Sequence, residues 1–338
     1  MSKHSNISIF VPHIGCPHKC SFCNQNAITG VSDIPRAADV RRVCEQALRD
    51  GVNPPDTEIA FFGGSFTAVP RWYMTELLDA AREYLSLGFR GIRLSTRPDA
   101  ITPEILDILA CSGVTAIELG AQSMCDDVLT LNERGHSAHD VEATSGLIKS
   151  HRRGFSLGLQ MMVGLYGSTP EKDIYTAKRL IELAPMEVRI YPTVVLKNTR
   201  LGELYSEGKY QTYELESAVE LCSTLLEMFE DAGIRVIKLG LHSSTDVERD
   251  MLGGIYHPAF RELCEARRFR NEMKSLSVKS GMRECVFYVR PQDLSKALGQ
   301  HRENIRYFDD LGIKVEVKPR PGQSKKLCLS GWEDETCI

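Results

Sequence analysis

Strand-like and helix-like segments alternate for about the first two hundred residues of this 338-residue chain, and this alternation limits the folds open to it. Short apolar runs rich in Ile, Val and Phe predict strands, and amphipathic stretches between them predict helices. The predicted strands are residues 7–12, 58–62, 91–95, 116–119, 156–162 and 187–193, and the predicted helices are 37–49, 72–86, 103–110, 139–152 and 170–183. This order predicts an α/β fold with a parallel sheet and right-handed crossovers.

Six strands of this kind fit either a partial (β/α)6 TIM barrel or an open, doubly wound sheet, and periodicity does not separate the two. In both architectures functional residues gather at the carboxyl ends of the strands. A helix at 214–232 and a strand at 234–239 are expected to cover one edge of the barrel. The pattern changes after Pro258, so we expect a barrel domain over 1–260 and a small α+β module over 261–338.

Three cysteines follow the first predicted strand directly, as Cys16, Cys20 and Cys23, with the aromatic Phe22 just before the last. Three thiolates in one short loop leave one iron of a four-iron cluster without a protein ligand, whereas four cysteines saturate such a cluster. A zinc site is the alternative, and zinc wants a fourth ligand, for which His13 and His18 are near enough. The other eight cysteines are scattered, as expected of reduced thiols in a cytoplasmic protein.

Composition is ordinary for a globular protein, with 42% hydrophobic and 25% charged residues. No apolar run approaches the ~18 residues that span a bilayer, and residues 1–6 do not have the form of a signal peptide. We therefore expect a cytoplasmic protein with no membrane partner and no disulfides.

The C-x3-C-x2-C spacing with Phe22 resembles the radical S-adenosylmethionine (SAM) superfamily. The resemblance implies a [4Fe-4S] cluster on Cys16, Cys20 and Cys23, whose open iron chelates the amino and carboxylate groups of SAM. It also implies a partial TIM barrel and an external reductant such as flavodoxin or ferredoxin. In that superfamily the cluster donates an electron that cleaves SAM to a 5′-deoxyadenosyl radical.

The same resemblance implies further SAM contacts, each at the end of a predicted strand. Gly63 and Gly64 match the glycine pair whose backbone binds the SAM amino group, and Ser65 is placed to help. Gln122 and Arg134 keep the twelve-residue spacing of the Gln and Arg that contact SAM in oxygen-independent coproporphyrinogen oxidases. Arginine suits the carboxylate because its planar fork makes two parallel hydrogen bonds. Met162 lies in the segment that packs on the adenine.

Residues 117–136 and 189–210, together with the Thr-Arg-Pro-Asp run at 96–99, resemble the Elongator catalytic subunit. That family often has a glutamate at the position of Ser95, which we expect near SAM. Tyr191, at the end of the sixth strand, either faces the substrate as a catalytic residue or is a core aromatic. The match covers residues 7–260 and lacks the acetyltransferase domain of that family, so we do not expect acetyl transfer to carry over.

The C-terminal module has a predicted strand–helix–turn–helix–strand order that resembles a KH domain, whose G-x-x-G loop clamps single-stranded nucleic acid. Gly299 matches the first glycine, Arg302 replaces the second, and Arg306 follows. Residues 261–326 carry 16 Lys and Arg against 9 Asp and Glu, although the net charge of the whole chain is −4. The alternative is a βααβ module with a structural role only.

Together these features predict a radical SAM enzyme that abstracts a hydrogen atom, with RNA (tRNA or rRNA) as its substrate. A small-molecule radical enzyme of the coproporphyrinogen-oxidase type is the first alternative. A non-catalytic iron–sulfur protein that binds RNA or haem is the second. SAM cleavage separates both enzymes from the binding protein, and RNA binding separates the first enzyme from the second.

Overall fold

The computed structural model describes residues 5–11, 16, 20–24, 34–241 and 245–330. The described chain divides into two compact units. The first holds the residues up to Tyr213 together with Phe229–Tyr256, and the second holds Glu214–Met228 and the residues from His257 onward. The zinc alternative invoked His13 and His18, which lie outside the described residues. The predicted boundary between residues 260 and 261 stays a prediction.

The first unit is built on a seven-stranded sheet in which every neighbouring pair is parallel and the strands follow chain order. Its strands are β1 (Ser5–Val11), β2 (Thr57–Gly63), β3 (Gly91–Thr96), β4 (Val114–Gln122), β5 (Ser156–Val163), β6 (Glu187–Pro192) and β8 (Arg235–Leu239). A doubly wound sheet reverses its strand order at a switch point. The unbroken order found here confirms the partial TIM barrel, and β8 lies at the edge expected for the strand at 234–239.

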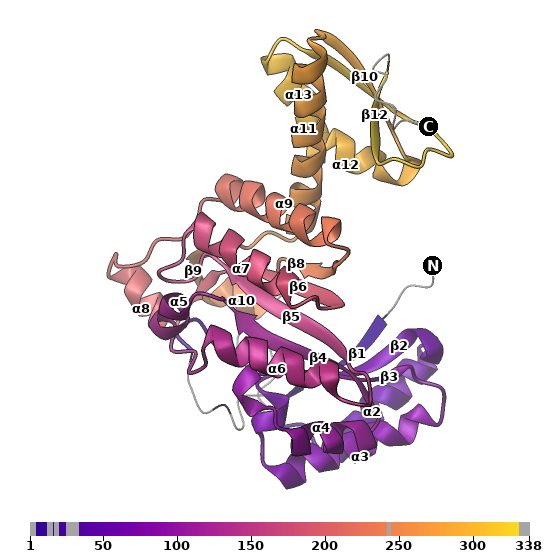
Figure 1. Ribbon diagram of the computed structural model, residues 1–338, viewed down its shortest axis with the longest axis vertical. Coiled ribbons are helices and arrows are strands. Elements are labelled where there is room, and N and C mark those ends of the chain that lie inside the picture. Colours follow the sequence, from indigo (N-terminus) through magenta and orange to yellow (C-terminus); the bar gives the residue numbers. More distant parts are fainter. Residues whose placement is uncertain (1–4, 12–15, 17–19, 25–33, 242–244, 331–338) are drawn as a thin grey trace. The chain divides into compact units, whose positions relative to one another are not determined.

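Helices connect the strands and pack along one side of the sheet (Figure 1). They are α2 (Ala37–Arg49), α3 (Arg71–Leu85), α4 (Pro103–Cys111), α5 (Asp126–Leu131), α6 (Ala138–Ser150) and α7 (Pro170–Glu182). Local sequence explains two of their starts. The Thr102 and Thr169 hydroxyls cap α4 and α7, and a proline follows in the first turn of each.

The side of the sheet away from these helices is polar, and its ion pairs show that the sheet is curled. Arg93 on β3 pairs with Glu58 on the neighbouring β2 at 2.7 Å and with Glu187 on β6. In a flat sheet β3 and β6 would lie about 14 Å apart, three strand spacings, which is beyond the reach of one arginine. Curling brings the strands together around the buried charges of Arg93, Glu118 and Glu187.

The remaining elements of the first unit follow β6. Strand β7 (Val194–Leu196) pairs antiparallel with β9 (Met251–Gly254), and α8 (Arg200–Ser206) and α10 (Thr245–Asp250) lie between them in the chain. Helix α9 (Leu215–Asp231) begins in the second unit and ends in the first. Among the helices of the described residues, none is both long enough and apolar enough to cross a membrane.

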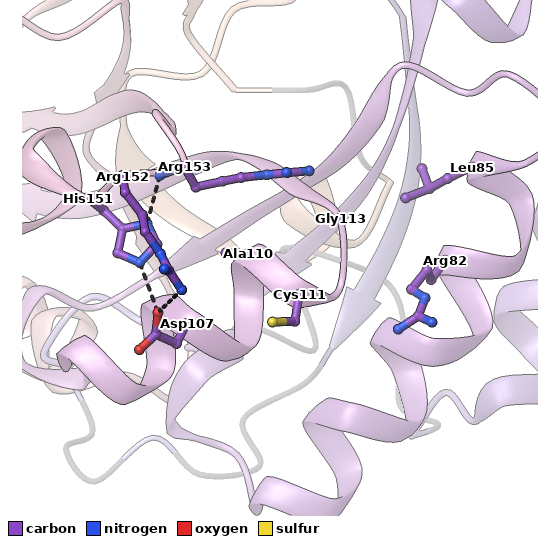
Figure 2. A pocket seen from close by; sticks show the side chains of 9 residues that line it. All are labelled: Arg82, Leu85, Asp107, Ala110, Cys111, Gly113, His151, Arg152 and Arg153. Atoms are coloured by element: carbon purple, nitrogen blue, oxygen red, sulfur yellow. Dashed lines mark hydrogen bonds and ion pairs between the residues drawn. The ribbon is translucent and has the colours of Figure 1, made fainter.

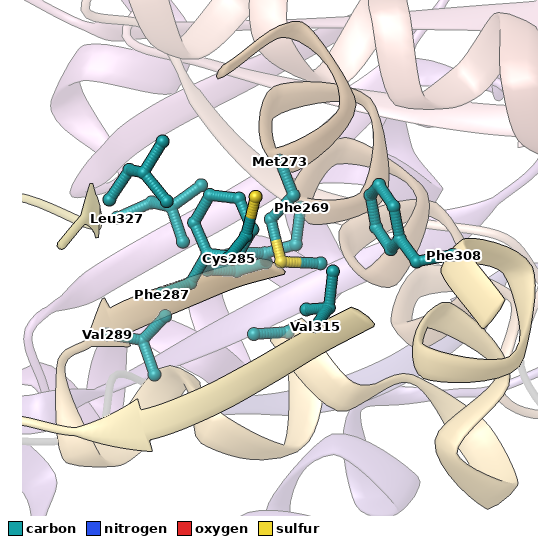
Figure 3. Close-up of a cluster of buried hydrophobic side chains, with 10 residues drawn as sticks. Phe269, Met273, Cys285, Phe287, Val289, Phe308, Val315 and Leu327 are labelled. Atoms are coloured by element: carbon teal, nitrogen blue, oxygen red, sulfur yellow. The ribbon is translucent and has the colours of Figure 1, made fainter. Parts of the chain in front are cut away.

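The second unit packs helices on one face of a three-stranded sheet with the order β11-β10-β12. Strands β10 (Glu284–Val289) and β11 (Lys314–Pro319) are parallel, and β12 (Leu327–Leu329) is antiparallel to β10. Helices α12 (Leu294–Leu298) and α13 (Glu303–Asp310) lie between β10 and β11 in the chain, which is the predicted βααβ order. The sequence did not predict the long α11 (Phe260–Ser280), whose Phe269 and Met273 point into the core with Phe287 and Phe308 (Figure 3).

Candidate functional site

A cavity of about 120 Å³ lies at the carboxyl ends of β2, β3 and β4, where the sequence placed its functional residues. We call it the cysteine cavity. Its lining contains most of the predicted site: Cys16, Cys20, Phe22, Cys23, Gly63, Gly64, Ser65, Ser95, Gln122 and Arg134. Residues more than a hundred positions apart in the chain therefore meet at one point of the barrel.

The three thiols share this cavity with arginine side chains. Arg134 Nη1 donates a hydrogen bond to Cys20 Sγ at 3.0 Å. Burial raises the pKa of Cys16, although the Ser65 backbone N–H opposes this effect. Burial, with Cys20 and Cys16 nearby, raises the pKa of Cys23 to about 12. A bound cation would overcome this resistance to ionisation, because metals bind thiolates and release their protons.

The thiols are not arranged as a finished metal site. Within the described residues, no three His, Cys, Asp or Glu side chains have the spacing of metal ligands as they stand. The donor set nevertheless fits an iron–sulfur cluster, because three thiols line one cavity and cysteine thiolates are the usual ligands of such clusters.

Gly63 ends β2 against the end of β1, and only glycine fits there. Its φ is +111°, and a Cβ on it would lie 2.5 Å from the Val11 carbonyl oxygen. The next residue, Gly64, donates its N–H to the same oxygen at 2.8 Å. The glycine pair thus fixes the end of β1, from which the chain continues to Cys16, and it also borders the cysteine cavity.

Ser65 and Ser95 line the cavity, and their SAM contacts stay predictions; the Ser65 hydroxyl already has partners. Its Oγ lies 2.8 Å from Thr96 Oγ1 and accepts a hydrogen bond from the Arg97 N–H at 3.2 Å. Phe22 contacts the guanidinium of Arg134, whose Cζ lies 6.0 Å from the ring centroid. These bonds hold the ends of β2 and β3 together beside the cysteines.

Gln122 and Arg134 each have a buried polar atom without a hydrogen-bond partner in the described structure. Gln122 sits at an irregularity in the β4–β5 pairing and has a φ of 65°, which is unusual for a residue other than glycine. Gln122 Oε1 and Arg134 Nε are buried, and neither has a hydrogen-bond partner in the described structure. Because buried polar atoms are normally paired, both atoms are free to bind a polar ligand in the cavity. Arg134 is held in place by its Nη2, which donates to the Gly120 carbonyl at 2.7 Å.

His136 lies buried beside these residues. Its Nε2 is 3.3 Å from the Ala121 carbonyl oxygen. Burial and the nearby Arg134 lower the pKa of His136 to about 4, so the imidazole is neutral at pH 7. A neutral, buried imidazole fits a structural polar role better than a role as a proton donor.

Met162 and Tyr191 are not among the residues that line the cysteine cavity. They lie opposite each other in register near the ends of β5 and β6, and both are half-buried. Burial raises the pKa of Tyr191. The adenine contact of Met162 and the catalytic role of Tyr191 stay predictions.

Three polar residues that line the cavity, Thr96, Arg97 and Gln160, were missed as site residues. Gln160 lines the cavity and donates to Glu118 at 2.8 Å. Gln160 lies two residues before Met162 on the same strand, and side chains two positions apart on a strand point to the same face. This spacing could have placed both side chains on the barrel interior. Arg97 also lines the cavity, pairs with Asp99 at 2.9 Å, and donates to the Arg134 carbonyl at 2.5 Å. It therefore supports the backbone that carries Arg134.

The predicted RNA-binding residues Gly299, Arg302 and Arg306 belong to the second unit. The loop between α12 and α13 has φ values of 72° at Gly299, 49° at His301 and 59° at Arg302. Arg302, which stands where a G-x-x-G loop has its second glycine, therefore adopts a backbone conformation typical of glycine. The side chains of Arg302 and Arg306 are exposed, and neither makes an ion pair with another described residue.

The excess positive charge of residues 261–326 is smaller in the folded unit than the sequence stretch implied. Glu216 and Glu220 of α9 belong to the same unit and pair with Arg267 at 2.5 Å and 2.8 Å. Arg270 pairs with Glu303 at 3.2 Å. A phosphate contact is therefore suggested by Arg302 and Arg306, which have no ion-pair partner among the described residues. It is not suggested by a basic charge of the whole unit.

Two family models match the chain. The radical SAM superfamily model matches residues 10–180, and the radical SAM C-terminal domain model matches residues 185–271. Among solved structures, archaeal Methanocaldococcus infernus Elp3 matches with a TM-score of 0.56 and 22% identity, over 73% of this chain and 62% of that one. Methylornithine synthase matches with a TM-score of 0.50 and 14% identity, over 93% and 83%. Both likenesses show the partial-barrel fold.

Curated relatives extend the match in sequence. An uncharacterized protein of Methanocaldococcus jannaschii is 31% identical over 229 residues, which cover 67% of each chain. A tRNA uridine(34) acetyltransferase of Methanocaldococcus infernus is 26% identical over 64% of this chain and 48% of its own. Elongator complex protein 3 of Homo sapiens is 28% identical over 74% and 49%.

The chain thus spans about half the length of the last two relatives. They confirm the resemblance to the Elongator catalytic subunit that the sequence motifs predicted. With a superfamily model matched over residues 10–180 and the barrel in place, the chain belongs to the radical SAM superfamily.

Proposed function

We propose that this protein is a radical SAM enzyme that modifies RNA, with tRNA as the favoured substrate. The observation that supports radical SAM chemistry is the set of residues that line the cysteine cavity. Three thiols, a glycine pair and the buried, unpartnered atoms of Gln122 and Arg134 line one small space. These are the donors needed to hold a cluster and a zwitterionic ligand side by side.

In this proposal Cys16, Cys20 and Cys23 hold a [4Fe-4S] cluster, and the cavity beside them binds SAM. When bound, the cluster supplies the electron for reductive cleavage of SAM, received from a donor such as flavodoxin or ferredoxin. Arg134 holds the SAM carboxylate through its free Nε–H, since Nη1 already donates to Cys20 Sγ and Nη2 to the Gly120 carbonyl.

The remaining residues orient SAM and limit the access of water. The Gly63–Gly64 backbone receives the amino group, and the Gln122 amide oxygen accepts a hydrogen bond from the ribose. Met162 and Tyr191, opposite each other on the barrel interior, face the adenine and the substrate. With SAM and the cluster bound, hydrogen-atom abstraction from a substrate carbon would take place at the barrel interior, where Met162 and Tyr191 lie.

Two observations support RNA as the substrate. Relatives that match most of the barrel are named for acting on tRNA uridine 34. The second unit presents the exposed, unpaired Arg302 and Arg306 beside a loop in left-handed conformation, an arrangement suited to phosphate contacts. We propose that the barrel performs the chemistry and the second unit binds the RNA backbone.

The chemical part is tested by SAM cleavage. The anaerobically reconstituted chain, reduced with dithionite, should convert SAM to 5′-deoxyadenosine and methionine. Cys20→Ala should abolish this conversion. Cys44→Ala is the matched control, because Cys44 is a buried cysteine of α2 outside the cavity. Equal loss of cleavage in both variants would point to misfolding, and cleavage retained in Cys20→Ala would refute the cluster assignment.

The RNA part is tested separately by nucleoside mass spectrometry of tRNA and rRNA from a strain that lacks the gene. We expect one modified nucleoside to disappear from tRNA and to return when the gene is restored. An unchanged nucleoside profile, together with SAM cleavage in vitro, would favour the small-molecule enzyme.

A further inference from the structure

A second cavity, of about 600 Å³, lies at the amino ends of the strands, on the side of the barrel opposite the cysteine cavity (Figure 2). We call it the arginine cavity. It is lined by the ends of α3 and α4 and by the segment after α6. Its polar side chains are those of Arg82, Asp107, His151, Arg152 and Arg153. These residues precede β3, β4 and β5 in the chain, whereas the cysteine cavity follows β2, β3 and β4.

The charges of this cavity are unbalanced. Three arginines line it with a single carboxylate, that of Asp107. That carboxylate is already shared, because Asp107 Oδ1 lies 3.3 Å from His151 Nε2 and 3.8 Å from Arg152 Nη2. The side chains of Arg82 and Arg153 make no ion pair or hydrogen bond with the described residues, and in Figure 2 no dashed line reaches either guanidinium group.

Local structure explains why cations gather here but does not neutralise them. Helices α3, α4 and α6 end at this cavity, and helix carboxyl ends carry a partial negative charge that favours arginine. Each end is equivalent to about half a charge, and its effect fades within one turn. Three such ends offset at most about one and a half charges, so the two free guanidinium groups keep a net positive charge and nearly all of their hydrogen-bond donors.

We propose that the arginine cavity binds a small phosphorylated ligand. Guanidinium groups match phosphate geometry with paired hydrogen bonds, and two of them suit a diphosphate or two separate phosphate groups. The cavity volume falls within the ~300–1,000 Å³ that small-molecule sites occupy, and Leu85 adds an apolar wall for an organic portion. Inorganic pyrophosphate and a nucleoside diphosphate both carry a diphosphate group, and the two arginines would bind that group in either ligand.

The site is separate from the SAM chemistry. Strand β5 alone has 8 residues, and at ~3.3 Å per residue it places its two ends about 25 Å apart. A ligand in the arginine cavity therefore does not touch the cysteines or SAM. Substitutions here should leave SAM cleavage unchanged, which distinguishes failure of this proposal from failure of the proposed function.

The test is isothermal titration of the full chain with inorganic pyrophosphate and with uridine diphosphate at low salt. The uracil probe avoids competition for a site that binds adenosine. We expect saturable binding of at least one probe, and tighter binding of uridine diphosphate would identify a nucleotide site. The double variant Arg82→Ala, Arg153→Ala should bind at least tenfold more weakly. Arg71→Ala, an exposed arginine at the other end of α3, is the matched control and should bind normally.

Asp107→Asn should have the opposite effect on binding of the two probes. It removes the one carboxylate that lines the cavity, so the probes should bind severalfold more tightly. The proposal is overturned if neither probe binds, or if the double variant binds as well as the parent. Loss of tRNA affinity in the double variant, with no binding of either small probe, would also overturn it, because the arginines would then be contacts for a nucleic acid.

Discussion

Replacing Gly63 with alanine should destabilise the first unit and disturb the cysteine cavity at the same time. The new Cβ would lie 2.5 Å from the Val11 carbonyl oxygen, and that neighbour is backbone, which yields little. The φ of +111° adds conformational strain of about 1–3 kcal/mol for a residue other than glycine. Overpacking of a well-filled site costs a further 1–3 kcal/mol or so. We therefore expect a loss of about 2–6 kcal/mol in the free energy of unfolding.

Urea unfolding followed by circular dichroism measures this loss. Gly146→Ala is the control, because Gly146 lies exposed in α6 and the methyl group of an alanine there would have nothing within 4 Å. That substitution should leave stability unchanged or raise it by up to about 1 kcal/mol, since alanine favours the helix. The surviving folded Gly63→Ala protein should also bind SAM more weakly. If Gly63→Ala were as stable as the parent, the close packing of β1 on β2 would not constrain the cysteine loop.

Three further predictions concern the SAM contact, the RNA-binding loop and a buried histidine. Arg134→Lys should weaken SAM binding roughly ten- to a hundredfold. Lysine keeps the charge but lacks the planar fork that holds Nε–H toward the cavity while both Nη nitrogens donate to Cys20 and Gly120. Unchanged affinity in a folded variant would make Arg134 structural. Arg302→Glu with Arg306→Glu should weaken tRNA binding at low salt and leave SAM cleavage intact, whereas the exposed Lys279→Glu should have little effect; equal binding by all three proteins would remove the KH-like loop from the account. His136 has a folded pKa of about 4, below its ordinary 6.5. Stability should therefore fall by about 3 kcal/mol as pH drops from 6.5 to 4, and urea titrations of His136→Gln should lack this component.

Sequence periodicity was sufficient to place the barrel strands, because strands buried on both sides read as short apolar runs between capped helices. It did not distinguish a barrel from an open sheet, since that difference lies in strand order. The polar interior of the barrel was also not predictable from the sequence. Glu58, Arg93 and Glu187 are spread over about 130 residues, and their pairing depends on a curl that no local pattern encodes.

The cysteine cavity was predictable in outline because its residues follow the ends of strands. The motif spacing named the cysteines, Gln122 and Arg134, and the fold brought them to one cavity. The structure adds a second reason for Gly63, which is the close approach of the Val11 carbonyl. Gln160 was missed because it belongs to no motif, although it lies two residues before Met162 on the same strand. Arg97 belongs to the Thr-Arg-Pro-Asp run, but its place at the cavity depends on how the barrel closes.

The second unit was the least predictable part. Its βααβ order followed from local patterns, but α11 was not expected because its polar and apolar residues show weak helical segregation. Net charge was misleading for a physical reason, since acidic residues of α9 are distant in sequence and pair with Arg267 in the folded unit. The left-handed conformation of Arg302 was likewise hidden, because an arginine in a sequence gives no sign of a positive φ.

The central claim is that three cysteines hold a cluster with one iron left for SAM. Electron paramagnetic resonance of the anaerobically reconstituted, dithionite-reduced chain tests it most directly, with iron counted in the same sample. We predict about four irons per chain and a reduced-cluster signal whose g values shift when SAM is added. Stoichiometric zinc in place of iron, or a cluster signal that SAM leaves unchanged, would contradict the account.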